Sequence, residues 1–155
     1  MLFKILIVDD HPIFREGLKS LIENENDLVV CCEASDSEQA LKNFRNSDCD
    51  LVTMDLSLAG GSGLQLIKQF KAMNKNTKIP VASMHDEFLF AERCIRAGAN
   101  GYMNKEEASQ KIITAIRDVL GGAFYLSDKM TRHLAQRNLE GGSDSCKTPE
   151  EVLSN

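Results

Sequence analysis

Short apolar runs alternate with amphipathic segments along most of the chain. The runs are rich in β-branched and aliphatic residues, which is typical of strands, whereas the segments between them repeat apolar residues every three or four positions, which is typical of helices. The expected strands are Phe3–Val8, Leu28–Ala34, Leu51–Asp55, Ile79–Met84 and Gly101–Met103. The expected helices are Pro12–Asn24, Ser37–Asn46, Leu64–Met73, Phe88–Ala97 and Ser109–Leu120.

This strict alternation predicts an α/β fold. Parallel strands need crossover connections, and right-handed crossovers place helices on both faces of the sheet. We expect residues 1–122 to form a doubly wound (βα)5 domain with a five-stranded parallel sheet. A further amphipathic helix from Ser127 to Arg137 indicates a linker over residues 123–137, and the polar, Gly- and Ser-rich residues 138–155 indicate a flexible tail.

Polar residues stand at the carboxyl ends of the predicted strands, where open parallel sheets bind ligands. Asp9 and Asp10 follow the first strand, Asp55 ends the third, Ser83 ends the fourth, and Lys105 follows the fifth. Three converging carboxylates repel one another, so they need a cation, and oxygen-only ligands suit Mg²⁺. The metal, the lysine and the hydroxyl would stabilise a phosphoryl group while one carboxylate attacks phosphorus, which predicts aspartyl-phosphate chemistry.

Four motifs stand in order along the chain: DD at Asp9–Asp10, MDLSLAGGSG around Asp55, SMHDE from Ser83, and GYMNK from Gly101 to Lys105. This ordered set resembles the receiver domain of bacterial two-component response regulators, whose fold is described as CheY-like or flavodoxin-like. The resemblance covers about residues 3–122.

The resemblance implies a phosphorylation switch in which a partner histidine kinase is the phosphodonor. It makes Asp55 the phosphoacceptor and Lys105 the cation that contacts the phosphoryl group. Mg²⁺ would be held by Asp9, Asp10, Asp55 and the backbone carbonyl of Ser57. Such a domain is not a turnover enzyme, although it phosphorylates and dephosphorylates itself.

The resemblance also implies switch residues and residues that tune the lifetime of the phosphoryl group. Ser83 is the switch hydroxyl and Tyr102 the aromatic ring that changes rotamer with it, while Ser57 and His85 tune the lifetime. Simpler interpretations remain: Ser83 as a small strand-end residue, Tyr102 as a half-buried strand aromatic, and His85, like His11, as an ordinary loop histidine.

The phrases DDHPIFREGL, SMHDE and AGANGYMNK are similar to the NarL/LuxR-type subfamily. In that subfamily a helix-turn-helix domain follows the receiver and begins after a motif like EEVLSN. We therefore expect a transcription output that binds DNA through a domain missing from this chain, with homodimerisation on phosphorylation.

Two positions depart from the family pattern. Ala59 stands where a proline is usual, in a loop with three glycines, which predicts a more mobile loop after Asp55. Pro80 lies inside the fourth strand, where its missing N–H is out of place, so the strand either starts late or bulges.

Composition narrows the class of protein further. The formal net charge is -5 and no basic face is evident, so the chain by itself should not bind nucleic acid. The 5 cysteines lack zinc or disulfide spacing and indicate reduced thiols; Cys31 and Cys32 are expected to point to opposite faces of a strand as core fillers. The apolar N-terminal run is too short for a membrane span, so we expect a cytoplasmic protein without membrane contact.

Two other functional classes remain open at this level. A Mg²⁺-dependent hydrolase of the haloacid-dehalogenase type also uses an aspartyl nucleophile, but it usually carries a DxD pattern after the first strand, where this chain has DDH. A stand-alone receiver that acts as an adaptor through protein contacts would share every motif above.

Overall fold

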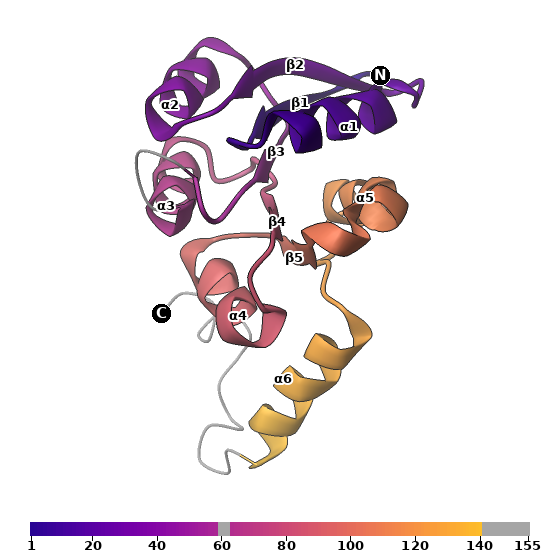
Figure 1. Ribbon diagram of the computed structural model, residues 1–155. Helices are drawn as coiled ribbons and strands as arrows, with labels where there is room; N and C mark the ends of the chain where they lie inside the picture. Colours follow the sequence, from indigo (N-terminus) through magenta and orange to yellow (C-terminus); the bar gives the residue numbers. More distant parts are fainter. Residues whose placement is uncertain (59–62, 141–155) are drawn as a thin grey trace.

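Five parallel strands form one sheet in the order β2-β1-β3-β4-β5, with helices on both faces (Figure 1). This architecture comes from a computed structural model, which describes residues 1–58 and 63–140. The elements are β1 (Phe3–Val8), α1 (Pro12–Glu23), β2 (Leu28–Ala34), α2 (Ser37–Asn46), β3 (Leu51–Met54), α3 (Gly63–Met73), β4 (Pro80–Ser83), α4 (Glu87–Ala97), β5 (Gly101–Asn104), α5 (Lys105–Leu120) and α6 (Asp128–Glu140). The predicted doubly wound fold is confirmed.

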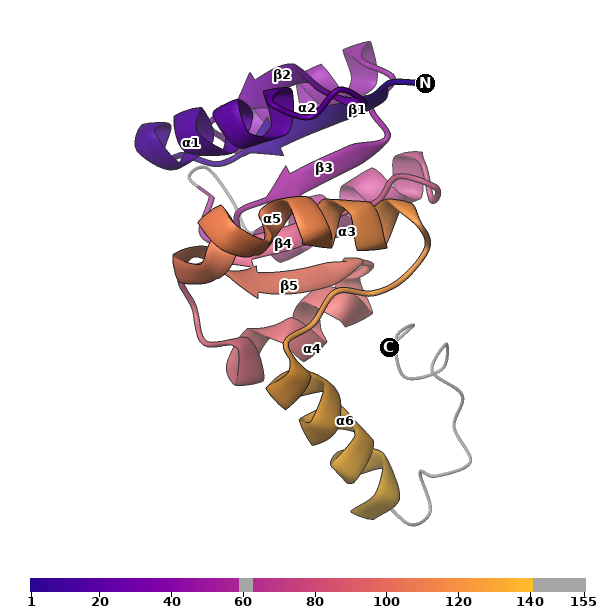
Figure 2. The ribbon, with the colours of Figure 1, turned by 90° about the vertical axis from the view of Figure 1, so that its right-hand side faces the viewer.

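Alternation along β1 explains the two layers of core. Ile5 and Ile7 pack in one cluster with residues of α1 and α5, whereas Leu6 and Val8 pack in a second cluster with residues of α2, α3 and α4. All four side chains are buried, as expected for a strand covered on both faces. Figure 2 shows α5 crossing the near face of the sheet and the arrowheads of β3, β4 and β5 pointing to one edge.

Helix α5 begins four residues before the expected Ser109. The side chain of Asn104 accepts a hydrogen bond from the Glu106 N–H at 2.9 Å and caps the helix, and the acidic residues Glu106 and Glu107 lie in its first turn. Lys105 is therefore the first residue of a helix rather than part of a loop.

Pro80 is the first residue of β4, so the strand starts late. The pairs that join β3 to the β4 segment are Leu51 with Lys78 and Met54 with Val81, and Pro80 lies between them, where it offers no N–H to the ladder. The other side of the strand is regular, and Ser83 pairs with Asn104.

The two adjacent cysteines of β2 do not point to opposite faces, and that prediction was wrong. The register between β1 and β2 shifts after Ile5, which leaves Cys31 as an extra residue, and the two Sγ atoms lie 3.5 Å apart. A bulge of this kind interrupts the alternation of side chains. Cys31 is exposed, so it is not a core filler.

The segment after α5 is docked on the domain. Tyr125 pairs with Gly101 at the edge of β5, and Met130 of α6 is 1% exposed within the second core cluster. Helix α6 runs to Glu140 rather than to the expected Arg137. The prediction for the loop at Ala59, and that for the tail from residue 141 onward, fall outside the described residues.

Candidate functional site

Acidic side chains meet at the carboxyl edge of the sheet. Asp9 and Asp10 follow β1, and Asp55 follows the neighbouring strand β3. Asp9 and Asp55 are each 2% exposed, which is rare for carboxylates without compensation. The carboxyl ends of parallel strands were expected to bring these acids together; the roles of the residues stay predictions.

Lys105 provides the compensating positive charge from the start of α5. Its Nζ lies 2.7 Å from Asp9 Oδ2 and 3.5 Å from Asp55 Oδ2, and its side chain is 5% exposed. The same ammonium lies over the ring of Phe14 at 4.6 Å, so aromatic cover on one side directs it towards the carboxylates.

His11 is the site residue that sequence reasoning missed. Its Nδ1 lies 2.9 Å from Asp9 Oδ1, 3.1 Å from Asp10 Oδ1 and 3.6 Å from Asp55 Oδ2. The sequence carries a local signal for this position, because Pro12 is the first helical residue and makes His11 the N-cap of α1. The His11 side chain makes no capping hydrogen bond. The ring is therefore available to the pocket.

Among the described residues, the carboxylate of Asp55 accepts one hydrogen bond. The Ser57 N–H donates to Oδ1 at 3.2 Å, while Oδ2 is buried without a hydrogen bond. Burial raises the pKa of Asp55, and the nearby charge of Asp9 raises it further, while Lys105 opposes both. Gly63 leaves room here, since a Cβ would meet the Asp55 carbonyl oxygen at 2.9 Å.

The pocket fits a divalent cation. Ligand atoms of Asp9, Asp10, His11 and Asp55 all lie within 4.8 Å of one another. Three carboxylates against one ammonium leave two net negative charges. Within residues 1–58 and 63–140, the buried Oδ1 of Asp10 and Oδ2 of Asp55 have no hydrogen-bond partner. Carboxylate oxygens are the ligands that Mg²⁺ prefers, and a ring nitrogen beside them adds a ligand that borderline metals accept.

Ser83 and Tyr102 are connected to this pocket through hydrogen bonds to His85. The Ser83 hydroxyl accepts from the His85 N–H at 3.0 Å, and the Tyr102 hydroxyl donates to the His85 carbonyl at 2.9 Å. The His85 Nε2 in turn contacts the hydroxyl of Ser57. Ser83 is fully buried, and burial raises the pKa of Tyr102 to about 12. Hydrogen bonds thus connect Asp55, Ser57, His85, Ser83 and Tyr102.

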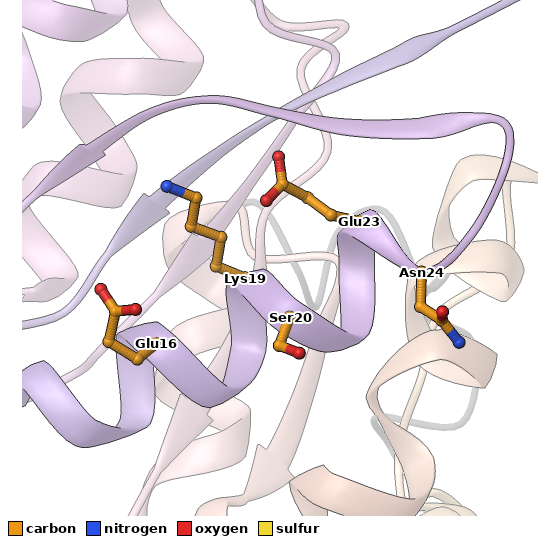
Figure 3. Close-up of a pocket in the computed structure, with 5 residues that line it drawn as sticks. All are labelled: Glu16, Lys19, Ser20, Glu23 and Asn24. Carbon is orange, nitrogen blue, oxygen red and sulfur yellow. The ribbon is translucent and has the colours of Figure 1, made fainter.

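A surface hollow elsewhere carries no comparable chemistry. It is lined by Glu16, Lys19, Ser20, Glu23 and Asn24, which all come from α1 and its C-cap (Figure 3). Side chains of a single helix face do not converge on a ligand there. The acidic edge is the better candidate site.

Comparison with known families agrees with this geometry. The family model described as the response regulator receiver domain matches residues 5–117. The chain belongs to this family. Receiver domains act as signalling switches and generally bind Mg²⁺ in an acidic pocket, and here that pocket is the cluster of Asp9, Asp10 and Asp55.

Relatives place the receiver domain in the NarL/LuxR type. The chain is 32% identical over 139 residues to the response regulator UvrY of Escherichia coli strain K12. The aligned region covers 90% of the chain and 64% of UvrY. The chain is 34% identical over 153 residues to the transcriptional regulatory protein ComA of Bacillus subtilis strain 168, covering 97% of the chain and 72% of ComA. The chain thus spans less than two thirds of the length of UvrY.

A solved structure shows the same fold. The two-component response regulator of the LuxR family from Aurantimonas sp. SI85-9A1 superposes with a TM-score of 0.82 at 32% identity, covering 90% of this chain and 99% of that one. Among the described helices, none is long and apolar enough to span a membrane.

Because the pKa of Asp55 is raised, we expect Asp55→Asn to stabilise the receiver domain in EDTA at neutral pH. The expected gain is about 1 kcal/mol, the usual size of the effect of one substitution. The amide keeps the shape and removes a buried charge close to Asp9. Because the folded-state pKa is raised, the cost of this charge appears as pH rises through that pKa and disappears below it, so the gain should fade in acid.

Chemical denaturation with and without Mg²⁺ measures this effect. Bound metal should stabilise the wild type and remove the advantage of Asp55→Asn. Asp48→Asn, at an exposed carboxyl, is the control. It should leave the free energy of unfolding unchanged both with and without Mg²⁺. A less stable Asp55→Asn protein in EDTA would contradict the electrostatic account.

Proposed function

We propose that this receiver domain is the phosphorylation-dependent switch of a two-component system, in which a partner histidine kinase transfers a phosphoryl group to Asp55 in the cytoplasm. The observation that carries the proposal is the Oδ2 of Asp55, buried without a hydrogen bond and 3.5 Å from the Lys105 ammonium. A buried carboxylate next to an ammonium group can accept a group that brings more negative charge.

The transfer is a displacement at phosphorus. A carboxylate oxygen of Asp55 forms the new O–P bond, the P–N bond to the kinase histidine breaks, and that imidazole leaves with the bonding electron pair and takes up a proton. Lys105 then contacts the phosphoryl oxygens, which weakens its hold on Asp9. Bound Mg²⁺ would neutralise charge on the phosphoryl oxygens.

The proposed metal ligands are Asp9, Asp10, Asp55 and the backbone carbonyl of Ser57. The cluster distances and the two net negative charges of the pocket support the three carboxylates. Ser57 is supported by its position two residues after Asp55, where its N–H already bonds the phosphoacceptor.

The switch itself would pass through His85. If the Ser83 hydroxyl moves to a phosphoryl oxygen, it leaves the His85 N–H, and Tyr102 loses a fixed partner at the His85 carbonyl. The two arrangements of Ser83 and Tyr102 then form the two states whose balance phosphorylation shifts.

The conformational change would be transmitted from Tyr102 to the linker segment and α4. Tyr102 N–H donates to the Tyr125 carbonyl at 2.8 Å, and the Ser127 N–H donates to Glu87 Oε2 of α4 at 3.0 Å. The ring of Phe88 in α4 contacts that of His133 in α6 at 5.2 Å. A change at Tyr102 would therefore reach the segment that leads into α6 through the backbone hydrogen bond to Tyr125.

We also propose that phosphorylation favours a homodimer and controls transcription through a DNA-binding domain of the whole protein. Exposed apolar side chains near α4 and the linker support a contact surface, namely Met84, Phe88, Leu89 and Phe124. The transcriptional role rests on the similarity to ComA and UvrY.

Incubation with acetyl phosphate and Mg²⁺ tests the central proposal. Intact mass should show one phosphoryl adduct on the wild type and none on Asp55→Asn, because the amide offers no nucleophilic carboxylate. Asp48→Asn should behave as the wild type. An absent adduct, or one that persists in Asp55→Asn, would remove the proposed function.

The contact between Ser57 and His85 predicts a second effect, on the lifetime of the phosphoryl group. His85→Ala and Ser57→Ala each remove one partner of this contact beside Asp55, and the dephosphorylation rate should change by about two- to fivefold, as expected for one exposed hydrogen bond. Loss of the phosphoryl adduct over time measures the rate, with Asp48→Asn at an exposed carboxyl as the control. Unchanged rates in both variants would show that these residues do not tune the lifetime.

Docking of the linker on Tyr102 predicts faster amide hydrogen exchange in residues 123–134 after phosphorylation, with α2 unchanged. Gly101→Ala should raise this exchange without phosphorylation, because its Cβ would meet the Tyr125 carbonyl oxygen at 2.8 Å. Mass spectrometry of exchanged peptides measures both, with Asp55→Asn as the non-phosphorylated control. Equal exchange before and after phosphorylation would exclude the linker as the route of output.

A further inference from the structure

A pair of thiols stands on the edge strand of the sheet, away from the acidic pocket. Cys31 Sγ and Cys32 Sγ are 3.5 Å apart, close to van der Waals contact. In a regular strand these neighbours would point to opposite faces. The pair exists because the register passes from Ile5–Val30 to Leu6–Cys32 and leaves Cys31 as the extra residue of a bulge.

Each sulfur is oriented by its own partner. Cys31 Sγ donates to the Ile5 carbonyl at 3.4 Å, and Cys32 Sγ donates to the Ser47 hydroxyl at 3.7 Å. Cys31 is exposed and Cys32 is half-buried, in contrast to the buried Cys49 and Cys94. Among the described strands β2 lies at the edge of the sheet, and reagents can reach the pair from solvent through the exposed Cys31.

A disulfide fits this pair poorly. Consecutive Cα atoms are about 3.8 Å apart, shorter than the roughly 4.4–6.8 Å that disulfides span. The desolvation of the Cys31 thiol and its contact with Cys32 raise its pKa to about 12, so the thiol stays protonated at neutral pH and is a weak nucleophile.

A zinc ion fits poorly as well, since structural zinc takes four ligands. Within residues 1–58 and 63–140, the set of three or more Cys, His, Asp or Glu ligand atoms close enough for a metal is the acidic pocket, which contains neither thiol. The ligand that matches the pair is a soft metal or metalloid atom that needs two sulfur ligands from the protein.

We propose that Cys31 and Cys32 form a chelating site for trivalent arsenicals. With phenylarsine oxide, both S–H bonds break and two As–S bonds form. The oxygen leaves as water with both protons, and arsenic remains trivalent, so the reaction needs no oxidant or reductant. The site does not depend on the proposed function, because it shares no residue with the acidic pocket.

The experiment loads the full chain with one equivalent of phenylarsine oxide and then adds excess glutathione. Intact mass should show one phenylarsenic group in place of two hydrogens, stable to glutathione and removed by 2,3-dimercaptopropanol. Chelation by two linked thiols should tighten binding by about 100-fold or more over a single thiol. Cys31→Ser and Cys32→Ser should therefore each lose the adduct, while Cys146→Ser keeps it.

A second measurement needs no variant. After loading, the protein is unfolded and alkylated with iodoacetamide, and the tryptic peptide from Ser20 to Lys42, which holds both cysteines, should remain unalkylated. An adduct that either serine variant retains, or an alkylated peptide in loaded wild type, would overturn the proposal.

Discussion

Electrostatic repulsion at the carboxyl ends of the strands is the constraint on which the rest of the structure depends. Because β1 and β3 are parallel neighbours, their ends bring Asp9 and Asp55 out of water at the same place. The ammonium of Lys105 opposes them directly, from a helix that begins at this residue because Asn104 caps it. The charge that remains makes the pocket a receptor for a cation and sensitive to any added phosphoryl group.

The two edges of the sheet are protected in different ways. The segment around Tyr125 covers the edge of β5, and its backbone bonds to Asn100 and Tyr102 connect that edge to α6. The opposite edge carries the bulge of β2, which interrupts pairing and leaves a thiol in solvent. Edge strands need such protection because unpaired backbone groups invite other strands. The covered edge would serve the signalling output, and the bulged edge brings two thiols together.

Much of the fold was predictable because its signals are local. Apolar periodicity located every strand and helix of the domain, and the acids and the lysine at strand ends followed once the strands were known to be parallel. The start of α5 was misplaced by one turn because the cap at Asn104 outweighed the hydrophobic pattern. The missing N–H of Pro80 predicted either a late start or a bulge, and the structure shows the late start.

By itself the sequence determined the order of elements and the carboxylates and lysine that meet, since these depend on neighbouring residues and on the geometry of any parallel sheet. Only the tertiary structure decided that His11 turns into the pocket, that Cys31 and Cys32 share one side of a strand, and that Tyr125 lies against β5. Each of these depends on the register or packing of segments far apart in the chain. A one-residue shift in pairing reverses where a side chain points, and no local pattern records that shift.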